Sequence, residues 1–487
     1  MYSKNLILII LLSFINLSFA QSEIANISEI YKNRVTTPDE VIPLVDKKNN
    51  RFALVMLNGK DIKGYLFNEM NELIGELNSE DKEREYKQIL GQTILANQDF
   101  VVFLTTKNRR KFASSRFSFE TNKIEFMEIN LDLENEKILQ TADYDNKFHL
   151  ITIVPKTGII NIYRFDNAIN YNKHSIDFSN NTFQNHKQKP ENLYDMVTVN
   201  SGFYGLNKSV DVVKIETENP TTLEIACNPT KIYQDNNYIT LTFDSNQNTT
   251  QIVDIDLARL KGEVHNIDKA MNNWPYKTKN SNSFLDKSTL YQIVSTRSAF
   301  HLSAQNFRTG ELINEYSAHE HEKIKFKNSS IVQTGGTFDN HREFEDTSKL
   351  LRKLNKGYPG IAVQTQGDLK LISYGGVIQQ NSSTFVMPAP GFGLPVASLG
   401  AITVFINPTF FAYESYTHTK ALKVDALFNS NFEHQEGVVN ENVFDKIELF
   451  EEENNISPNG RTVFKLNDTI ILGNYVAFNK TYTLRSF

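Results

Sequence analysis

Two histidines separated by a single residue are the most evident candidate metal ligands in this sequence. His319 and His321 lie in SAHEHEKIKF, residues 317–326, and alternation along a strand would place both on one face. Two imidazoles in that arrangement can bind a divalent metal, but a tight site takes three or four ligands. Asp339 and His341 are the nearest residues that would complete the set. Surface histidines beside acids are also ordinary, so a solvated turn is the competing interpretation, and we expect no cofactor.

Sequence motifs for covalent or phosphate chemistry are absent. The chain contains no G-x-S-x-G elbow, phosphate loop, dinucleotide fingerprint or H-E-x-x-H zinc motif. It does contain 57 Asp and Glu residues, and two facing carboxylates in a central channel are enough to cleave a sugar linkage. The sequence does not reveal which carboxylates converge. A non-enzymatic protein is therefore the favoured hypothesis, and a glycosidase or lyase that degrades polysaccharide is the alternative.

An uncharged stretch near the C-terminus is the main candidate for binding. Residues 371–413 contain no Asp, Glu, Lys or Arg, although the 22% content of the chain predicts about nine. Its prolines and glycines exclude one long helix. Either this stretch is buried on the scaffold, or it presents an apolar contact surface to a protein or polysaccharide partner. Both interpretations involve the same large side chains, which are Phe392, Leu394, Phe410 and Phe411.

The elements that must carry these residues form a repeat. RFALVML, DFVVFLTT and KFHLITIV begin their apolar runs at Phe52, Phe100 and Phe148, which are spaced by 48 and 48 residues. Similar runs begin at Tyr238 and Leu290, and MVTVNSGFYGL (196–206) occupies the intermediate place. Polar turns and a second alternating segment follow each run, as a meandering antiparallel sheet requires.

Short strands with a constant period of this size favour a β-propeller. The sequence predicts an all-β protein with about seven or eight blades, and a pair of β-sandwiches is the alternative. We expect propeller repeats over 21–316, an irregular insertion with one short helix and the apolar loop over 317–420, and final strands that close the propeller over 421–487. The helix is predicted from DTSKLLRKLNKGYPG, with Leu350, Leu351 and Leu354 on its buried face.

The N-terminus predicts export. Residues 1–20 combine a lysine, an apolar run and small residues before Gln21, as a secretory signal peptide does. We expect a chain without a transmembrane anchor after cleavage, located in the periplasm or outside the cell. Cys227 is the single cysteine, so the chain cannot form an internal disulfide. The net charge of −6 gives no attraction for nucleic acid. The oligomeric state is left open.

Overall fold

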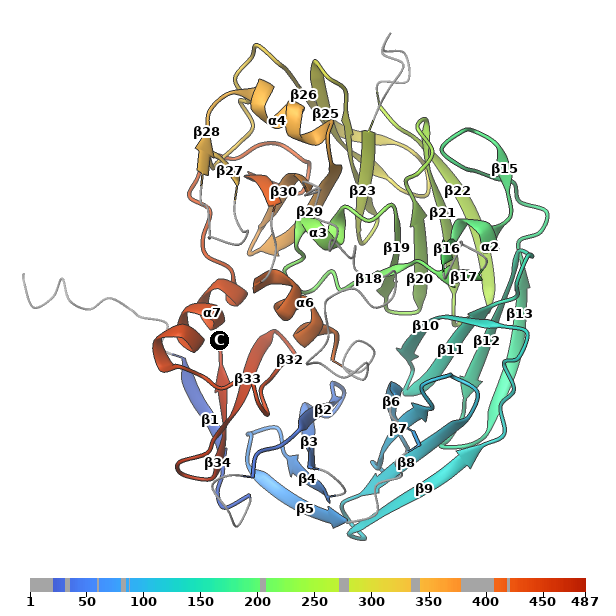
Figure 1. Cartoon of the computed structure of the whole chain (residues 1–487), viewed down its shortest axis with the longest axis vertical. Helices are drawn as coiled ribbons and strands as arrows, with labels where there is room; N and C mark the ends of the chain where they lie inside the picture. Colours follow the sequence, from blue (N-terminus) through green and yellow to red (C-terminus); the bar gives the residue numbers. More distant parts are fainter. Residues whose placement is uncertain are drawn as a thin grey trace, which may run out of the picture.

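Seven sheets of four or five strands follow one another around a common centre in the computed structural model (Figure 1). The structure describes residues 21–30, 36–58, 61–79, 85–86, 88–201, 207–270, 280–333, 342–377, 407–417 and 421–487. In each sheet one edge strand faces the centre and the other lies at the rim. The protein is a seven-bladed β-propeller, as the repeat predicts.

Blades 1 to 3 have four strands each, from the centre outwards: β2 (Glu40–Asp46), β3 (Arg51–Asn58), β4 (Asp61–Phe67) and β5 (Leu73–Ser79); β6 (Gln88–Ile94), β7 (Phe100–Thr105), β8 (Phe112–Ser118) and β9 (Lys123–Ile129); β10 (Lys137–Tyr144), β11 (Lys147–Ile153), β12 (Ile159–Phe165) and β13 (Tyr171–Asp177). Blade 4 adds β18 (Val213–Ile215) on the inside of β19 (Thr230–Asp235), β20 (Tyr238–Phe243), β21 (Thr249–Asp256) and β22 (Lys261–Asp268). Blade 5 contains β23 (Asn280–Asp286), β24 (Thr289–Ser295), β25 (Ala299–Asn306) and β26 (Leu312–His319).

The apolar runs of the repeat are the second strands of blades 1 to 5. These strands are covered on both sides by neighbouring blades, so they are apolar along their whole length rather than alternating. Phe52, Phe100 and Phe148 open β3, β7 and β11 and are each at most 1% exposed. The spacing of 48 residues therefore corresponds to one complete blade.

The hydrophobic core lies between blades rather than inside any one of them. Each large cluster of buried side chains combines residues of adjacent sheets. Between blades 2 and 3, for example, the rings of Phe103 and Phe148 stack with centroids 4.2 Å apart. Gly91 makes this possible, because a Cβ at that position would lie 2.5 Å from the Phe148 ring. A blade therefore cannot bury its surface without its neighbours.

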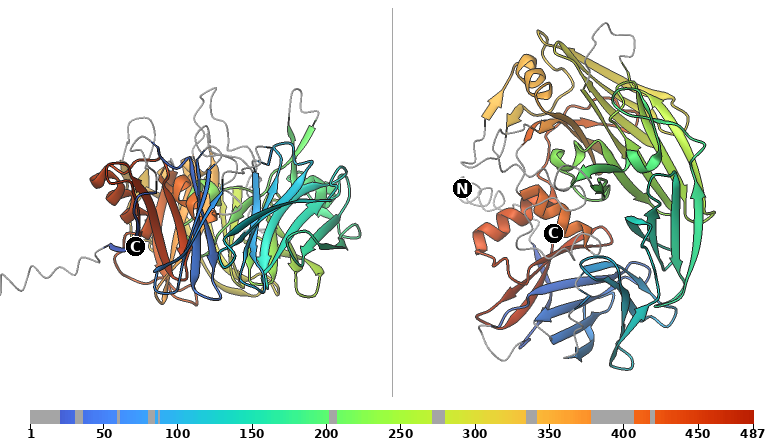
Figure 2. Two further views of the ribbon diagram at one scale, coloured as in Figure 1. Left: turned by 90° about the horizontal axis from the view of Figure 1, so that it is seen from below. Right: turned by 45° about the vertical axis from the view of Figure 1, so that its right-hand side comes forward.

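Both ends of the described chain meet in blade 7. Its strands are β32 (Thr462–Leu466), β33 (Thr469–Val476), β34 (Thr481–Ser486) and, at the rim, β1 (Ser22–Ile27). β1 pairs with β34 in antiparallel register, from Ser22 opposite Ser486 to Ile27 opposite Tyr482. The ring is thus closed by main-chain hydrogen bonds between the two ends of the sequence, as Figure 2 also shows.

One step of the sequence repeat does not correspond to a blade. MVTVNSGFYGL was interpreted as the run midway between Phe148 and Tyr238, but its described part forms only α2 (Leu193–Met196) and β16 (Thr198–Ser201). β16 pairs with β17 (Asn207–Val210) in a two-stranded sheet, as β14 (Phe183–Gln184) does with β15 (Pro190–Glu191). An apolar run shorter than a blade imitates the period here, and 178–229 is an insertion between blades 3 and 4.

The region expected to be irregular, 317–420, contributes a blade. Blade 6 consists of β29 (Tyr358–Gln366), β30 (Leu369–Val377), β31 (Ala421–Phe428), β27 (Ile331–Gln333) and β28 (Arg342–Phe344). Its outer strands precede its inner strands in the sequence, so the regular spacing is lost although the sheet is present. The predicted helix is α4 (Thr347–Leu354), whose three leucines are fully buried.

A second helix in this region, α6 (Pro408–Thr417), was not expected. Pro408 opens it, at the position where a missing N–H costs least. Two further helices are α3 (Leu223–Ala226) and α7 (Val443–Asn454). Among the described residues, none of the helices has the length and apolar character to span a bilayer.

The closing strand can be tested with a pair of substitutions in β1. Ile27→Ala should lower the free energy of unfolding by about 2–5 kcal/mol, because Ile27 is 4% exposed and packs between blades 7 and 1. Glu23→Ala, at an exposed position of the same strand, should change it by less than about 0.5 kcal/mol. Urea unfolding measures both, and equal effects would contradict a sealing role for β1.

His149 should make the fold sensitive to acid. Its side chain is buried in β11, its Nδ1 lies 2.9 Å from the Lys147 carbonyl oxygen, and burial lowers its pKa from 6.5 to about 4. Between these values only the unfolded chain binds the proton. The free energy of unfolding should therefore fall as the pH drops from 6.5 to 4, by up to about 3 kcal/mol. His149→Gln should flatten this part of the profile, whereas His174→Gln, at an exposed position of the same blade, should leave it unchanged; parallel profiles for wild type and His149→Gln would refute the assignment.

Candidate functional site

The centre of the propeller is occupied by a segment of the chain itself. Residues 211–228, here called the axial segment, belong to the insertion between blades 3 and 4. β18 pairs in parallel with β19 of blade 4, and α3 contacts β29, β30 and β31 of blade 6. Figure 1 places β18 and α3 inside the ring of sheets. The axial segment thus connects blades on opposite sides of the centre.

Buried contacts fix this segment along its length. Asn219, 3% exposed, donates from Nδ2 to Thr409 Oγ1 of α6 at 3.1 Å. Leu223 and Ala226 belong to the core cluster that includes blades 4, 5 and 6. Gly360 lets β29 approach α3, since a Cβ there would lie 3.1 Å from the Leu223 carbonyl oxygen. The axial segment is therefore part of the core of the propeller.

Charged side chains near the axial segment are mostly paired. Glu218 contacts Lys465 of the inner strand β32 at 3.3 Å and Lys47, after the inner strand β2, at 3.9 Å. Glu216 pairs with Lys214 at 2.6 Å. These pairs link the axial segment to blades 7 and 1 and neutralise both of its glutamates.

Asp143 is the carboxyl group here whose properties could serve acid catalysis. It lies near the end of the inner strand β10, and its side chain is accessible to solvent. Desolvation by its surroundings raises its pKa to about 7, against the attraction of Lys47 and Lys214. A carboxyl group that is still protonated near neutral pH can donate a proton to a leaving group. Hydrolysis or elimination would also need a second carboxylate at a suitable distance.

Helices α6 and α7, here called the wedge, fill the space between blades 6 and 7 (Figure 1). Their apolar side chains form one cluster with blade 7, in which Tyr413 and Phe444 pack with ring centroids 5.3 Å apart. α7 begins with a capping box between Asn442 and Asp445. Elsewhere in the ring, the described sheets pack directly on one another, so the wedge is the exceptional interface.

Arg461 joins the wedge to blade 7. Its Nη1 donates to Glu451 Oε2 at 2.6 Å, Nη2 contacts Glu414, and its guanidinium lies 5.6 Å from the centre of the Tyr413 ring. Tyr413 also donates to Glu451, at 2.8 Å. Burial raises the pKa of Glu451 to about 7, but the contact with Arg461 favours the carboxylate, so the two effects oppose each other.

The four predicted contact residues divide between described and undescribed parts of the chain. Phe410 is 5% exposed and belongs to the apolar cluster of the wedge, as the core interpretation expects. Phe411, on the same helix, is half-buried. Phe392 and Leu394 lie outside the described residues. The contact interpretation of the whole stretch remains a prediction.

The two histidines do not share the face of one strand. β26 ends at His319, and the following residues form a turn, so the alternation does not extend to His321. The side chain of His321 is 88% exposed and pairs with Glu320 at 3.4 Å. No group of three or more possible metal ligands occurs among the described residues. Asp339 and His341 lie outside them, so the metal hypothesis remains untested.

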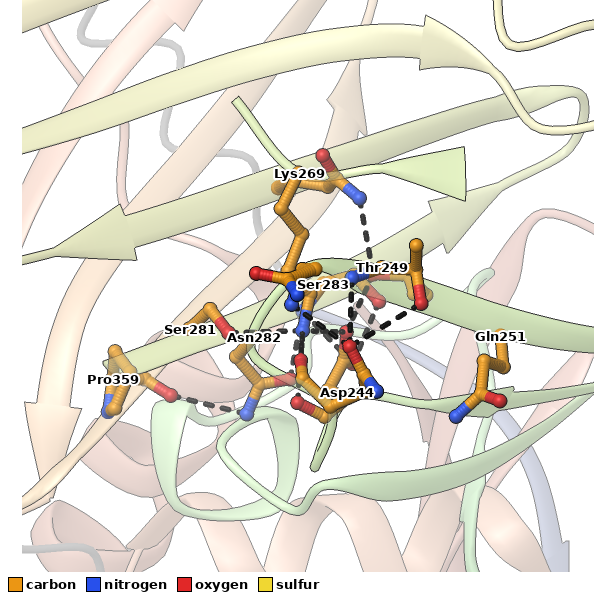
Figure 3. Close-up of polar contacts among 12 residues, drawn as sticks. Asp244, Thr249, Gln251, Lys269, Ser281, Asn282, Ser283 and Pro359 are labelled. Atoms are coloured by element: carbon orange, nitrogen blue, oxygen red, sulfur yellow. Dashed lines mark hydrogen bonds and ion pairs between the residues drawn. The ribbon is translucent and has the colours of Figure 1, made fainter. Parts of the chain in front are cut away.

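Sequence reasoning missed a buried polar cluster between blades 4 and 5 (Figure 3). Lys231, Lys269 and Asp244 converge there with Asn282, and all four are at most 3% exposed. They are up to 51 residues apart in the sequence. The only local signal is that polar residues border the strands β19, β20, β22 and β23, which is ordinary for strand ends.

No protein-family model and no curated protein matches the sequence. The fold is similar to the solved structures of the Dos1 propeller (10% identity, TM-score 0.34, 96% of this chain and 95% of that one) and of an oligogalacturonate lyase in complex with manganese (8%, 0.34, 96% and 97%). It is also similar to prolyl oligopeptidase B from Galerina marginata (9%, 0.31, 90% and 47%). These likenesses are too distant to carry an argument about activity.

The structural role of the axial segment can be tested at α3. Leu223→Ala should lower the free energy of unfolding by about 2–5 kcal/mol, because Leu223 is 3% exposed. Glu218→Ala should cost at most about 1 kcal/mol, because the Glu218 side chain is 64% exposed and its ion pairs are solvated. Chemical unfolding of both variants makes the comparison. If Leu223→Ala is as mild as Glu218→Ala, the segment is not part of the core.

Proposed function

We propose that this protein is an exported, non-enzymatic β-propeller that binds or scaffolds a partner in the cell envelope or outside the cell. The observation that carries the proposal is the occupied centre of the ring. Residues 211–228 lie where channel carboxylates would have to face a substrate, and both glutamates of this segment are paired with lysines. Export is inferred from the signal-like residues 1–20.

The wedge is the surface we assign to the partner. It is the one place where helices replace direct packing between two described blades, and it adjoins the uncharged stretch that precedes α6. Leu449 of α7 is 52% exposed, which offers an apolar contact beside the half-buried Phe411. A rigid scaffold that carries such elements is a common arrangement for recognition.

The charge of α7 favours a protein partner over an acidic polysaccharide. Glu452 and Glu453 are exposed in its last turn, which contains no basic residue. Carboxylates at the C-terminus of a helix repel its dipole, so a partner with ammonium or guanidinium groups would relieve an existing strain. An acidic polysaccharide would add further repulsion.

Binding can be tested with matched variants of exposed apolar residues. Leu449→Ser, and separately a chain whose residues 385–395 are replaced by a Gly/Ser loop, should each reduce binding to envelope extracts of the source organism at least about tenfold, the loss of roughly 1.4 kcal/mol. Ile74→Ser, at a 56% exposed site on the rim of blade 1, is the control and should bind as wild type does. Thermal melting must first show that all variants are folded.

Treating the extract identifies the class of partner. Sensitivity of the binding to protease indicates a protein, and sensitivity to periodate indicates a polysaccharide. If all folded variants bind like wild type, the wedge is not the contact surface.

The alternative function, cleavage of a polysaccharide, rests on the raised pKa of Asp143. Incubation with a panel of neutral and acidic polysaccharides, followed by assays for reducing ends and unsaturated products, should detect no turnover. Turnover by wild type that Asp143→Asn abolishes would replace the binding proposal with an enzyme.

A further inference from the structure

The polar cluster between blades 4 and 5 places a lysine amine against an asparagine amide in a site closed to solvent (Figure 3). Lys231 comes from β19 and Asn282 from β23, the inner strands of the two blades. Lys231 Nζ lies 2.6 Å from Asn282 Oδ1. The side chains of Lys231 and of the neighbouring Asp244 have no exposed surface. The two groups are thus held in contact without competing water.

The cluster contains more positive than negative charge. Lys231 and Lys269 lie 3.0 Å and 3.7 Å from carboxylate oxygens of Asp244, and both described ion pairs go to this one aspartate. Three acceptors surround the Lys269 ammonium, namely two main-chain oxygens and Ser281 Oγ. A second ammonium in such a site is costly, and burial lowers the pKa of Lys231. The neutral amine, which is the nucleophilic form, is thereby favoured.

The Asn282 amide is held at both ends. Its oxygen accepts a hydrogen bond from the Ser283 main-chain N–H at 2.8 Å, so a donor is already aimed at the atom where negative charge would develop during attack. Its nitrogen donates to the carbonyl oxygens of Cys227 at 2.6 Å and Pro359 at 3.1 Å. The amide therefore cannot rotate away from the amine.

Asp244 is fixed as a proton acceptor beside the amine. Its Oδ2 lies 3.0 Å from Lys231 Nζ and accepts from the Ser283 hydroxyl at 2.7 Å, while Oδ1 accepts from Thr250 Oγ1 at 2.8 Å. These contacts leave the carboxylate oriented toward the reacting pair. Lys, Asn and Asp are the three groups that an amide exchange requires.

We propose that Lys231 and Asn282 react to form an intramolecular isopeptide bond, with Asp244 as the proton-transfer group. Asp244 takes a proton from the Lys231 ammonium, and the free amine attacks Cγ of Asn282. The new Nζ–Cγ bond forms and the Cγ–Nδ2 bond breaks. The leaving nitrogen takes a proton from Nζ and the proton from Asp244, so that ammonium leaves and the carboxylate is restored. No oxidant, metal or cofactor is needed.

The bond would connect two adjacent blades at their inner strands. It would close a loop between residues 51 apart in a chain whose single cysteine permits no internal disulfide. It would also remove one of the two buried positive charges and leave Lys269 paired with Asp244. Cross-links of this kind restrict the unfolded chain as a disulfide does.

Mass spectrometry of a protease digest of the folded full chain tests the proposal directly. The expected result is a pair of linked peptides, one with Lys231 and one with Asn282, whose mass is their sum less one ammonia. Total mass alone is insufficient, since an N-terminal Gln21 left by signal cleavage also loses ammonia on cyclising. Unlinked peptides alone, after prolonged incubation of the folded protein at neutral pH, would overturn the proposal.

Variants then assign the roles. Lys231→Arg keeps the charge but removes the nucleophile, and the linked pair should be absent. Asn282→Asp should give the same linked product with loss of water instead of ammonia. Asp244→Asn, if folded by thermal melting, should be unlinked; a linked Asp244→Asn protein would overturn the role of Asp244. The wild-type digest decides the main question even if a variant does not fold.

Discussion

The structure depends on one packing constraint: each sheet is apolar on both faces of its central strands and must be covered on both sides. A single blade such as β2–β5 cannot meet this condition, so the sheets must continue around a ring until the last covers the first. The join between β1 and β34 satisfies the condition at the end of the chain and also leaves no uncovered edge on blade 7. The wedge satisfies it between blades 6 and 7, where helices supply the apolar surface that a sheet supplies elsewhere.

Ring closure creates a second problem at the centre, where inner strands from opposite blades face one another. This chain fills the centre with residues 211–228, an insertion that would be a long surface loop in a sandwich. The axial segment then determines the character of the molecule. With its glutamates paired and α3 packed in the core, the centre contributes to stability, and recognition is displaced to the surface of the wedge.

Buried charge at the interface of blades 4 and 5 is the other unusual feature. Removing an ion pair from water costs free energy that its own attraction often fails to recover. Here two lysines share one aspartate, which is a poor arrangement for stability alone. The arrangement is understandable if the groups have a chemical role, because an enclosed amine, amide and carboxylate are also the components of an amide exchange. Like the axial segment, this cluster is assembled entirely from positions distant in sequence.

The sequence by itself determined the class of fold and the period of the blades, because burial on both faces writes a continuous apolar run at Phe52, Phe100 and Phe148. It also determined the helix α4, whose leucines follow helical spacing. It misplaced a blade at 196–206 and overlooked blade 6, because strand pairing out of chain order leaves no period to detect. Only the tertiary structure decided that 211–228 fills the centre, that α6 and α7 separate two blades, and that Lys231 meets Asn282. These are contacts between residues remote in the chain, and local pattern carries no information about which of many polar residues the ring will bring together.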